Sequence, residues 1–303
     1  MTYLQYLRID NNCLNGLSDF GKRLETNGEL KKIEIPEGVV KIRNYAFCGC
    51  RKIESIKMPD SVEIIGKGAF LGCSALNEIK ISKKLELICE DAFKNCKNLN
   101  NIQLPDSLEV IDKEAFKGCK NVTSIHIPRK LKYIDISSLD NCLNLKEITV
   151  DDNNSCFSSQ NNVLFNTDKT VLLFCPQKND IGDYKIPNCV VEIYDCAFFS
   201  CLKLTNINFP DSVTTIGTQA FSCCDGLERI TIPKNVTFIG NRAFEYCSNL
   251  RSVTIKNTVP PKWKDSFFNT NILTIYVPQS AVDAYKAADG WSQYADIIVG
   301  DEE

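Results

Sequence analysis

The chain has 303 residues, 44% of them hydrophobic and 24% charged, a composition typical of a globular protein and not of a disordered or fibrous one. Its 35 Lys and Arg nearly balance its 38 Asp and Glu, which argues against a surface for nucleic acid or anionic lipid. No apolar run approaches the roughly 18 residues of a transmembrane helix, and the single histidine, His126, excludes metal motifs that need two.

The chain begins with a segment that we assign, over residues 1–29, to a partial repeat or N-terminal cap. Leu4, Leu7 and Ile9 predict a first strand there. Residues 1–7 lack the basic stretch and apolar core of a secretory signal. Either such a signal has been removed, or the protein is intracellular, and the residues leave both possibilities open.

Residues 30–150 and 181–258 are built from a 23-residue repeat. An Ala-Phe dipeptide recurs at that step in two runs, from Ala46-Phe47 to Ala115-Phe116 and from Ala197-Phe198 to Ala243-Phe244. A cysteine follows the Phe position by three residues, and the eight cysteines in this place are Cys50, Cys73, Cys96, Cys119, Cys142, Cys201, Cys224 and Cys247. Repetition at a fixed period of this length indicates a solenoid.

Each repeat continues with an L-x-x-I-x-I pattern, as in Leu76, Ile79 and Ile81, which is the strand segment of a leucine-rich repeat. The alternation predicts one buried and one exposed strand face. A single repeat cannot bury its apolar side alone, whereas stacked copies share a core. We therefore predict an α/β leucine-rich-repeat solenoid with a parallel sheet of about twelve short strands. Its convex side is expected to be irregular or short-helical, and the whole to form one continuous domain.

Residues 151–180 interrupt the repeat. Two apolar runs, 163–165 and 171–174, flank the polar turn Asn166 to Lys169 and predict an inserted β-hairpin. Such insertions often emerge on a binding face, but a hairpin that covers an irregular repeat is the simpler interpretation. The acidic-amide run at 151–154 lacks the Gly and Glu of an EF-hand loop, so we do not expect calcium there.

Residues 259–303 change character and are assigned to a terminal repeat and C-terminal cap. Residues 274–278 predict one more strand, and Ser280 is a candidate N-cap for a helix over 281–288. With Trp291 and Tyr294 this helix would cover the open end of the stack, as repeat arrays require. The acidic tail 301–303 is expected to be solvated.

The repeat unit from Pro59-Asp60-Ser61-Val62 to Ile79 and Ile81 resembles the BspA-type leucine-rich repeats. Residues 161–177 are similar to that family's recurrent insertion, and residues 275–294 to the cap of its bacterial members. The resemblance implies a surface or secreted protein of host-associated anaerobic bacteria, with relatives in parasitic protozoa. It also implies adhesion to host matrix proteins such as fibronectin and fibrinogen, and it supplies no catalytic residues.

The 16 cysteines include no C-x-x-C pair, which argues against zinc. Stacked ladder cysteines would lie about 4.8 Å apart with parallel Cβ vectors, a poor geometry for a disulfide, and each would have equivalent neighbours on both sides. We interpret the eight as small buried apolar groups with weak S–H donors, and predict that they remain free thiols. The remaining cysteines follow no such pattern.

The residues point to binding and not to catalysis, and we expect no enzyme activity, cofactor or metal. His126 would face the concave side while Cys119 and Cys142 face inward, which separates a Cys–His pair. Glu78 and Glu147 would lie about 14 Å apart, too far for a glycosidase pair. The residues beside the buried strand positions form an exposed polar lattice. From it we select as candidate binding residues Lys57, Glu78, Lys80, Gln103, His126, Glu147, Asn208, Arg229 and Tyr276.

The sequence therefore predicts a cell-surface binding or adhesion module whose partner is a protein, with a host matrix protein implied by the resemblance and a glycan possible. We expect a monomer with no nucleic-acid partner and no membrane span. The alternative is an intracellular leucine-rich-repeat scaffold that binds another protein of the same cell.

Overall fold

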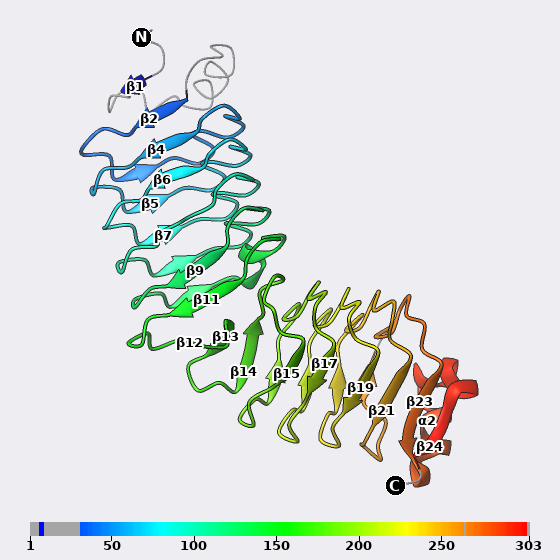
Figure 1. The fold of residues 1–303 in the computed structure, drawn as a ribbon. Coiled ribbons are helices and arrows are strands. Elements are labelled where there is room, and N and C mark those ends of the chain that lie inside the picture. Colours follow the sequence, from blue (N-terminus) through cyan, green and yellow to red (C-terminus); the bar gives the residue numbers. More distant parts are fainter. Residues whose placement is uncertain (1–5, 9–30, 264, 302–303) are drawn as a thin grey trace. The chain divides into compact units, whose positions relative to one another are not determined.

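The computed structural model describes residues 6–8, 31–263 and 265–301. The chain forms two compact units, unit 1 over residues 1–158 and unit 2 over residues 159–303, and each is described on its own. Within each unit the chain winds into stacked coils (Figure 1). The predicted solenoid of parallel strands is thus confirmed within the units, and continuity of one domain across their boundary stays a prediction.

The first column of strands in unit 1 comes from the L-x-x-I-x-I segments. Its parallel strands are β1 (Tyr6–Arg8), β2 (Lys32–Glu34), β4 (Ser55–Lys57) and β6 (Glu78–Lys80), followed after a break by β9 (Ser124–Ile127) and β11 (Glu147–Val150). Ile33, Ile56 and Ile79 stand in register at steps of 23 residues and point inward, while their neighbours are solvated. Of the first predicted strand, Leu7 pairs with Ile33, whereas Leu4 and Ile9 lie outside the described residues.

A second column of two-residue strands runs up the returning limb of each coil in unit 1. Its members are β3 (Lys41–Ile42), β5 (Ile64–Ile65), β7 (Leu87–Ile88), β8 (Val110–Ile111) and β10 (Tyr133–Ile134), all parallel. One coil continues from it into a short 3-10 helix, η3 (Ile136–Leu139). The convex side was expected to be irregular or short-helical, and the strands on this limb were not predicted.

Unit 2 repeats this arrangement. Its first column holds β15 (Asp183–Lys185) paired with β17 (Asn206–Asn208), and separately β19 (Arg229–Ile232), β21 (Ser252–Ile255), β23 (Thr274–Pro278) and β24 (Ile298–Asp301). Its second column runs β12 (Phe157–Gln160), β13 (Val163–Asn166), β14 (Val171–Phe174), β16 (Glu192–Ile193), β18 (Thr215–Ile216), β20 (Phe238–Ile239) and β22 (Lys262–Trp263). Tyr184 pairs with Ile207 and Ile186 is fully buried, so the repeat register resumes in the range 181–258 where the sequence predicts it.

The Ala-Phe-x-x-Cys turns form the third side of each coil and fill the core. The rings of Phe70, Phe93 and Phe116 are fully buried and stack at centroid distances of 5.2 and 5.4 Å. The Phe N–H of most turns donates to the carbonyl of the Ala in the next coil, as from Phe93 to Ala115 at 2.7 Å, and Phe116 and Phe244 donate in the same way to Ser138 and Ser266. The residue at this position of the ladder turns is fully buried and small, either alanine or serine.

The ladder cysteines hold neighbouring turns together. The Sγ–H groups of six ladder cysteines donate to the carbonyl of the Phe in the preceding coil, at Sγ to O distances of 3.0 Å for Cys73, 3.1 Å for Cys96 and 3.3 Å for Cys142. The same carbonyl accepts the N–H of the cysteine in its own turn, as Phe47 does from Cys50 at 3.2 Å. The Sγ–H of Cys201 donates instead to the carbonyl of Cys175 at 3.8 Å. The thiols therefore act as buried hydrogen-bond donors, as the sequence predicted, and the fifteen described cysteines are free.

The insertion opens unit 2 as a hairpin. β13 and β14 pair antiparallel, as predicted, and β14 then pairs in parallel with β16, so the hairpin joins the second column and its Val163, Leu164 and Phe165 are fully buried. Cys175 takes the place of a ladder phenylalanine, and its N–H donates to the carbonyl of Ala197 at 2.7 Å. The ring of Tyr184 fills the vacated volume and packs against Phe198 at 5.8 Å.

The C-terminal cap closes the core of unit 2. Helix α2 (Val282–Ala287) and the 3-10 helix η5 (Trp291–Ile297) bring Trp291, fully buried, onto Trp263 at a ring distance of 4.5 Å. The prediction that Ser280 caps the helix is wrong, because residues 279–281 form a 3-10 turn, η4 (Gln279–Ala281), and the helix begins at Val282 without a side-chain cap. The tail is partly held, since Asp301 pairs with Lys256 at 3.1 Å.

Candidate binding surface

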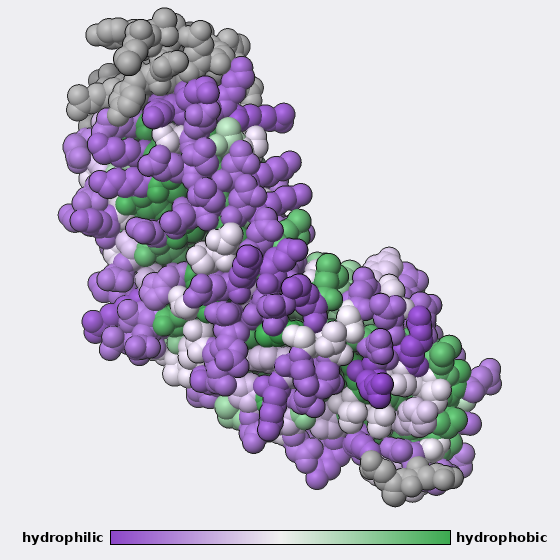
Figure 2. Space-filling view, in the orientation of Figure 1, coloured by the Kyte–Doolittle hydropathy of each residue, from purple (hydrophilic) through white to green (hydrophobic). Residues whose placement is uncertain are grey.

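The exposed side of the first strand column, here called the strand face, carries all nine candidate residues. Each of them is exposed. Six lie in unit 1, namely Lys57, Glu78, Lys80, Gln103, His126 and Glu147, and three lie in unit 2, namely Asn208, Arg229 and Tyr276. Figure 2 shows that hydrophilic side chains cover most of the visible face of each unit. The structure thus places these residues on a polar surface above a rigid core.

On the strand face of unit 1, two of the candidate residues contact side chains of neighbouring coils. Lys57 forms an ion pair with Glu34 in the preceding coil, and His126 Nδ1 lies 2.9 Å from Thr149 Oγ1 in the following one. Lys80 stands in register beside Lys57, so two like charges are neighbours across β4 and β6. Within the described chain Glu78, Lys80, Gln103 and Glu147 have no side-chain hydrogen-bond or ion-pair partner, so these candidates are the ones left for a ligand.

On the strand face of unit 2, one carboxylate organises the first coils. Asp183 Oδ1 accepts from the side-chain amides of both Asn206 and Asn208, at 3.0 and 2.9 Å. At the other end of the column Tyr276, with 37% of its surface exposed, stands in register beside Val299 on β24. Tyrosine is a residue type enriched in binding hot spots.

Among the residues that the structure describes, the strand column is interrupted once in each unit. The strand predicted around Ile102 and Leu104 does not form, so β6 ends one sheet and β9 begins another. In unit 2, β17 pairs with β15 but not with β19. A hollow of about 800 Å³ lies at the first break and one of about 360 Å³ at the second. These breaks were not predicted from the sequence.

A weak sequence signal accompanies both breaks. The last inward residue of the strand segment is β-branched in most coils, such as Ile127 and Ile232, but is Leu104 and Phe209 in the coils beside the breaks. β-branched residues favour extended backbone. Met58 lies in a coil that pairs normally, so the pattern alone does not locate a break.

The buried thiols are unsuited to nucleophilic chemistry. Burial raises the pKa of Cys142 to about 12 and that of Cys119 well above its usual value. A thiol is a nucleophile only as the thiolate, and both groups face the core while His126 is exposed. The geometry agrees with the expected separation of the histidine from the ladder cysteines.

The acidic-amide run at 151–154 has a structural role. Asn154 is buried, and its Nδ2 donates to the carbonyls of Pro128 and Leu131 at 2.7 and 3.0 Å. Its Oδ1 accepts the N–H groups of Cys156 and Phe157. Within the described ranges no group of three or more His, Cys, Asp or Glu is placed to hold a metal ion.

Stacked coils with L-x-x-I-x-I strands, a phenylalanine ladder and a polar strand face define a leucine-rich-repeat solenoid. The BspA-type leucine-rich-repeat family model matches residues 40–169 and 174–288 in six copies. The chain belongs to this family. No curated protein matches the sequence.

Solved bacterial structures share the fold. A leucine-rich repeat protein from Eubacterium ventriosum is 23% identical, with a TM-score of 0.74, over 91% of this chain and 75% of that one. A leucine rich cell surface protein from Faecalibacterium prausnitzii is 24% identical, with a TM-score of 0.57, over 89% and 82%. The pneumococcal vaccine antigen PcpA is 21% identical, with a TM-score of 0.58, over 90% and 80%. The chain is accordingly a protein-interaction module of the leucine-rich-repeat class.

No helix among the described residues is both long and apolar enough to cross a membrane.

Proposed function

We propose that the protein is a non-catalytic adhesion module of the cell surface that binds a host or matrix protein through its strand face. The observation that carries the proposal is the set of exposed polar side chains held at fixed register over a fully buried ladder core. A rigid surface of this kind loses little conformational entropy when it binds. The family membership and the surface location named for the Faecalibacterium protein support the same function.

Immobilised fibronectin and fibrinogen, with a panel of host extracellular-matrix proteins, provide the test. We expect a dissociation constant in the micromolar range or below, as for specific interfaces of moderate size. The variant Lys80→Glu/Glu147→Lys reverses two charges on the strand face and should weaken binding. The control Lys132→Ala removes an exposed charge, paired with Glu109, beside β10 and away from the strand face. Absence of any micromolar binder in the panel, or equal loss in the control, would contradict the proposal.

The free thiols favour a second candidate, an intracellular scaffold. Disulfides are common in secreted proteins, whereas thiols persist in reducing compartments, and all fifteen described cysteines are free. Fractionation of the source cells, with protease treatment of intact cells, separates the two. Loss of the protein on protease treatment supports the surface module, and protection supports the scaffold.

A further inference from the structure

We propose that the hollow at the first break is a binding cleft for an extended polypeptide segment, which docks by hydrogen bonds to unpaired backbone and amide side chains. The cleft is the hollow lined by Asn77–Ile81, Lys83, Asn100, Asn101 and Gln103–Asp106. It lies wholly within unit 1. The inference rests on the proposed role of the strand face and names its site and its ligand class.

Unpaired backbone is the first observation that supports the cleft. Residues 101–105 are not in a strand, and β6 and β9 belong to different sheets. No main-chain hydrogen bond joins residues 100–104 to a neighbouring coil, although equivalent residues are bonded in other coils, as Glu78 N–H is to the Glu54 carbonyl at 3.2 Å. Backbone donors and acceptors that lack protein partners are the groups to which extended peptides add.

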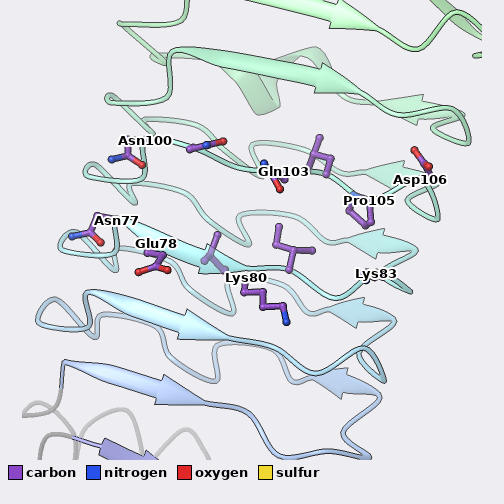
Figure 3. A pocket seen from close by; sticks show the side chains of 12 residues that line it. Asn77, Glu78, Lys80, Lys83, Asn100, Gln103, Pro105 and Asp106 are labelled. Carbon is purple, nitrogen blue, oxygen red and sulfur yellow. The ribbon is translucent and has the colours of Figure 1, made fainter.

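The side chains around this backbone are the second observation. Figure 3 shows Asn77, Glu78 and Lys80 on and beside β6, with Asn100, Gln103 and Asp106 on the next coil, which carries no strand in the first column. Within the described chain these side chains have no hydrogen-bond or ion-pair partner, unlike Lys57 and Glu34, which pair with each other in the two preceding coils. Amides donate and accept at once, as a peptide group requires.

The shape and chemistry of the cleft favour a peptide over a saccharide. Its volume of about 800 Å³ lies within the usual range for ligand sites. The aliphatic side chains of Ile79, Ile81 and Leu104 contribute to the lining, which contains no aromatic ring to stack on a sugar. Lys80 and Lys83 on one coil and Asp106 on the next would accommodate a peptide that bears both charges.

The second break provides an internal contrast. The hollow between β17 and β19 is smaller, and its Asn206 and Asn208 amides are already held by Asp183. Its Lys256 is paired with Asp301. The amide and lysine side chains at the second break thus already have partners within the protein, whereas those at the first break have none among the described residues. The proposal therefore concerns the first cleft alone.

The test begins with selection of binders from a phage-displayed library of random dodecapeptides on the full chain. Selected peptides are then titrated calorimetrically against wild type and the variant Asn101→Ala/Gln103→Ala. Loss of two hydrogen bonds should weaken binding about tenfold. Asn98→Ala, an exposed amide of the same coil outside the cleft, should change nothing. Peptides N-methylated at successive positions should lose affinity where a backbone N–H is used.

Three results would overturn the inference. They are a library that yields no binder sensitive to Asn101→Ala/Gln103→Ala, N-methylated peptides that bind undiminished, and a saccharide from a glycan array that competes at the cleft. If a matrix protein binds and its affinity falls with Glu147→Lys but not with the cleft variant, the proposed function stands and this inference alone fails. Thermal melting of each variant confirms that it is folded.

Discussion

Deletion of one ring from the phenylalanine ladder tests the packing on which the fold depends. Phe93 is fully buried and lies between Phe70 and Phe116, at ring distances of 5.2 and 5.4 Å. Truncation of a core phenylalanine to alanine typically costs about 3–5 kcal/mol, and two lost ring contacts of about 0.5–1.5 kcal/mol each favour the upper end. Phe93→Ala should therefore lower the free energy of unfolding by about 4–5 kcal/mol.

The assay is equilibrium urea denaturation followed by circular dichroism, with hydrogen exchange to localise the loss to unit 1. Phe93→Leu keeps most of the apolar volume and loses the stacking, so it should cost about 1–2 kcal/mol. Phe238→Ala makes the same deletion at a ring that is 45% exposed, and should cost about 1 kcal/mol or less. A Phe93→Ala variant within about 1 kcal/mol of wild type, or no more destabilised than Phe238→Ala, would refute the reasoning.

Three further predictions concern thiols, acid and backbone. Burial raises the pKa of the Cys142 thiol to about 12, so this thiol should resist alkylation by iodoacetamide at pH 8.5 while the exposed Cys189 is alkylated. Equal alkylation rates of the two cysteines, measured by peptide mass spectrometry, would contradict this. Lys94 and Lys117 lower the pKa of Glu114 from 4.5 to about 2, so its stabilisation is complete above about pH 4.5 and is lost as the pH falls toward 2. The stability gap between wild type and Glu114→Gln should close over that window in acid titrations, and a constant gap would count against the ion pairs. Gly68 has a φ of 57°, and an added Cβ would lie 2.5 Å from the Tyr45 ring. Gly68→Ala should therefore lower the free energy of unfolding by more than about 1 kcal/mol. A variant with an unchanged melting temperature would disprove this prediction.

Much of the fold could be predicted because one spacing governs it. The 23-residue step places Phe, Ala and Cys over their equivalents, and the strand at 274–278 and the hairpin at 163–174 form where the pattern places them. The exposure of the nine candidate residues follows from the same alternation. These features depend either on the residues of one segment or on the repeat spacing, and both can be read from a single sequence.

Features that depend on contacts between unlike coils could not be predicted. Tyr184 occupies an isoleucine position because Cys175, nine residues earlier in the chain, leaves ring-sized space beside Phe198. Asn154 lies in a run that looks solvated, yet it turns inward to bridge two carbonyls. Residues 101–105 leave the strand column although their sequence keeps the inward apolar residues of the other coils, and a leucine in place of isoleucine is too slight a signal to predict the break.

The hydrogen bonds between turns have a consequence for how such a chain can change its length. Since the Phe N–H of one turn bonds the Ala carbonyl one coil later, removal of residues 92–114 would bring Ala115-Phe116 under Phe70 as a like-for-like replacement. A deletion within the ladder that is not a whole number of repeats would shift the later side chains of the same run out of their layers. Coils of other lengths occur only outside the runs of equal repeats, such as the 26 residues from Leu7 to Ile33 and the 22 from Val253 to Ile275. Inside a run the chain can therefore lengthen or shorten by whole 23-residue units, and loss of residues 92–114 would also remove residues 100–104 and the cleft at that coil.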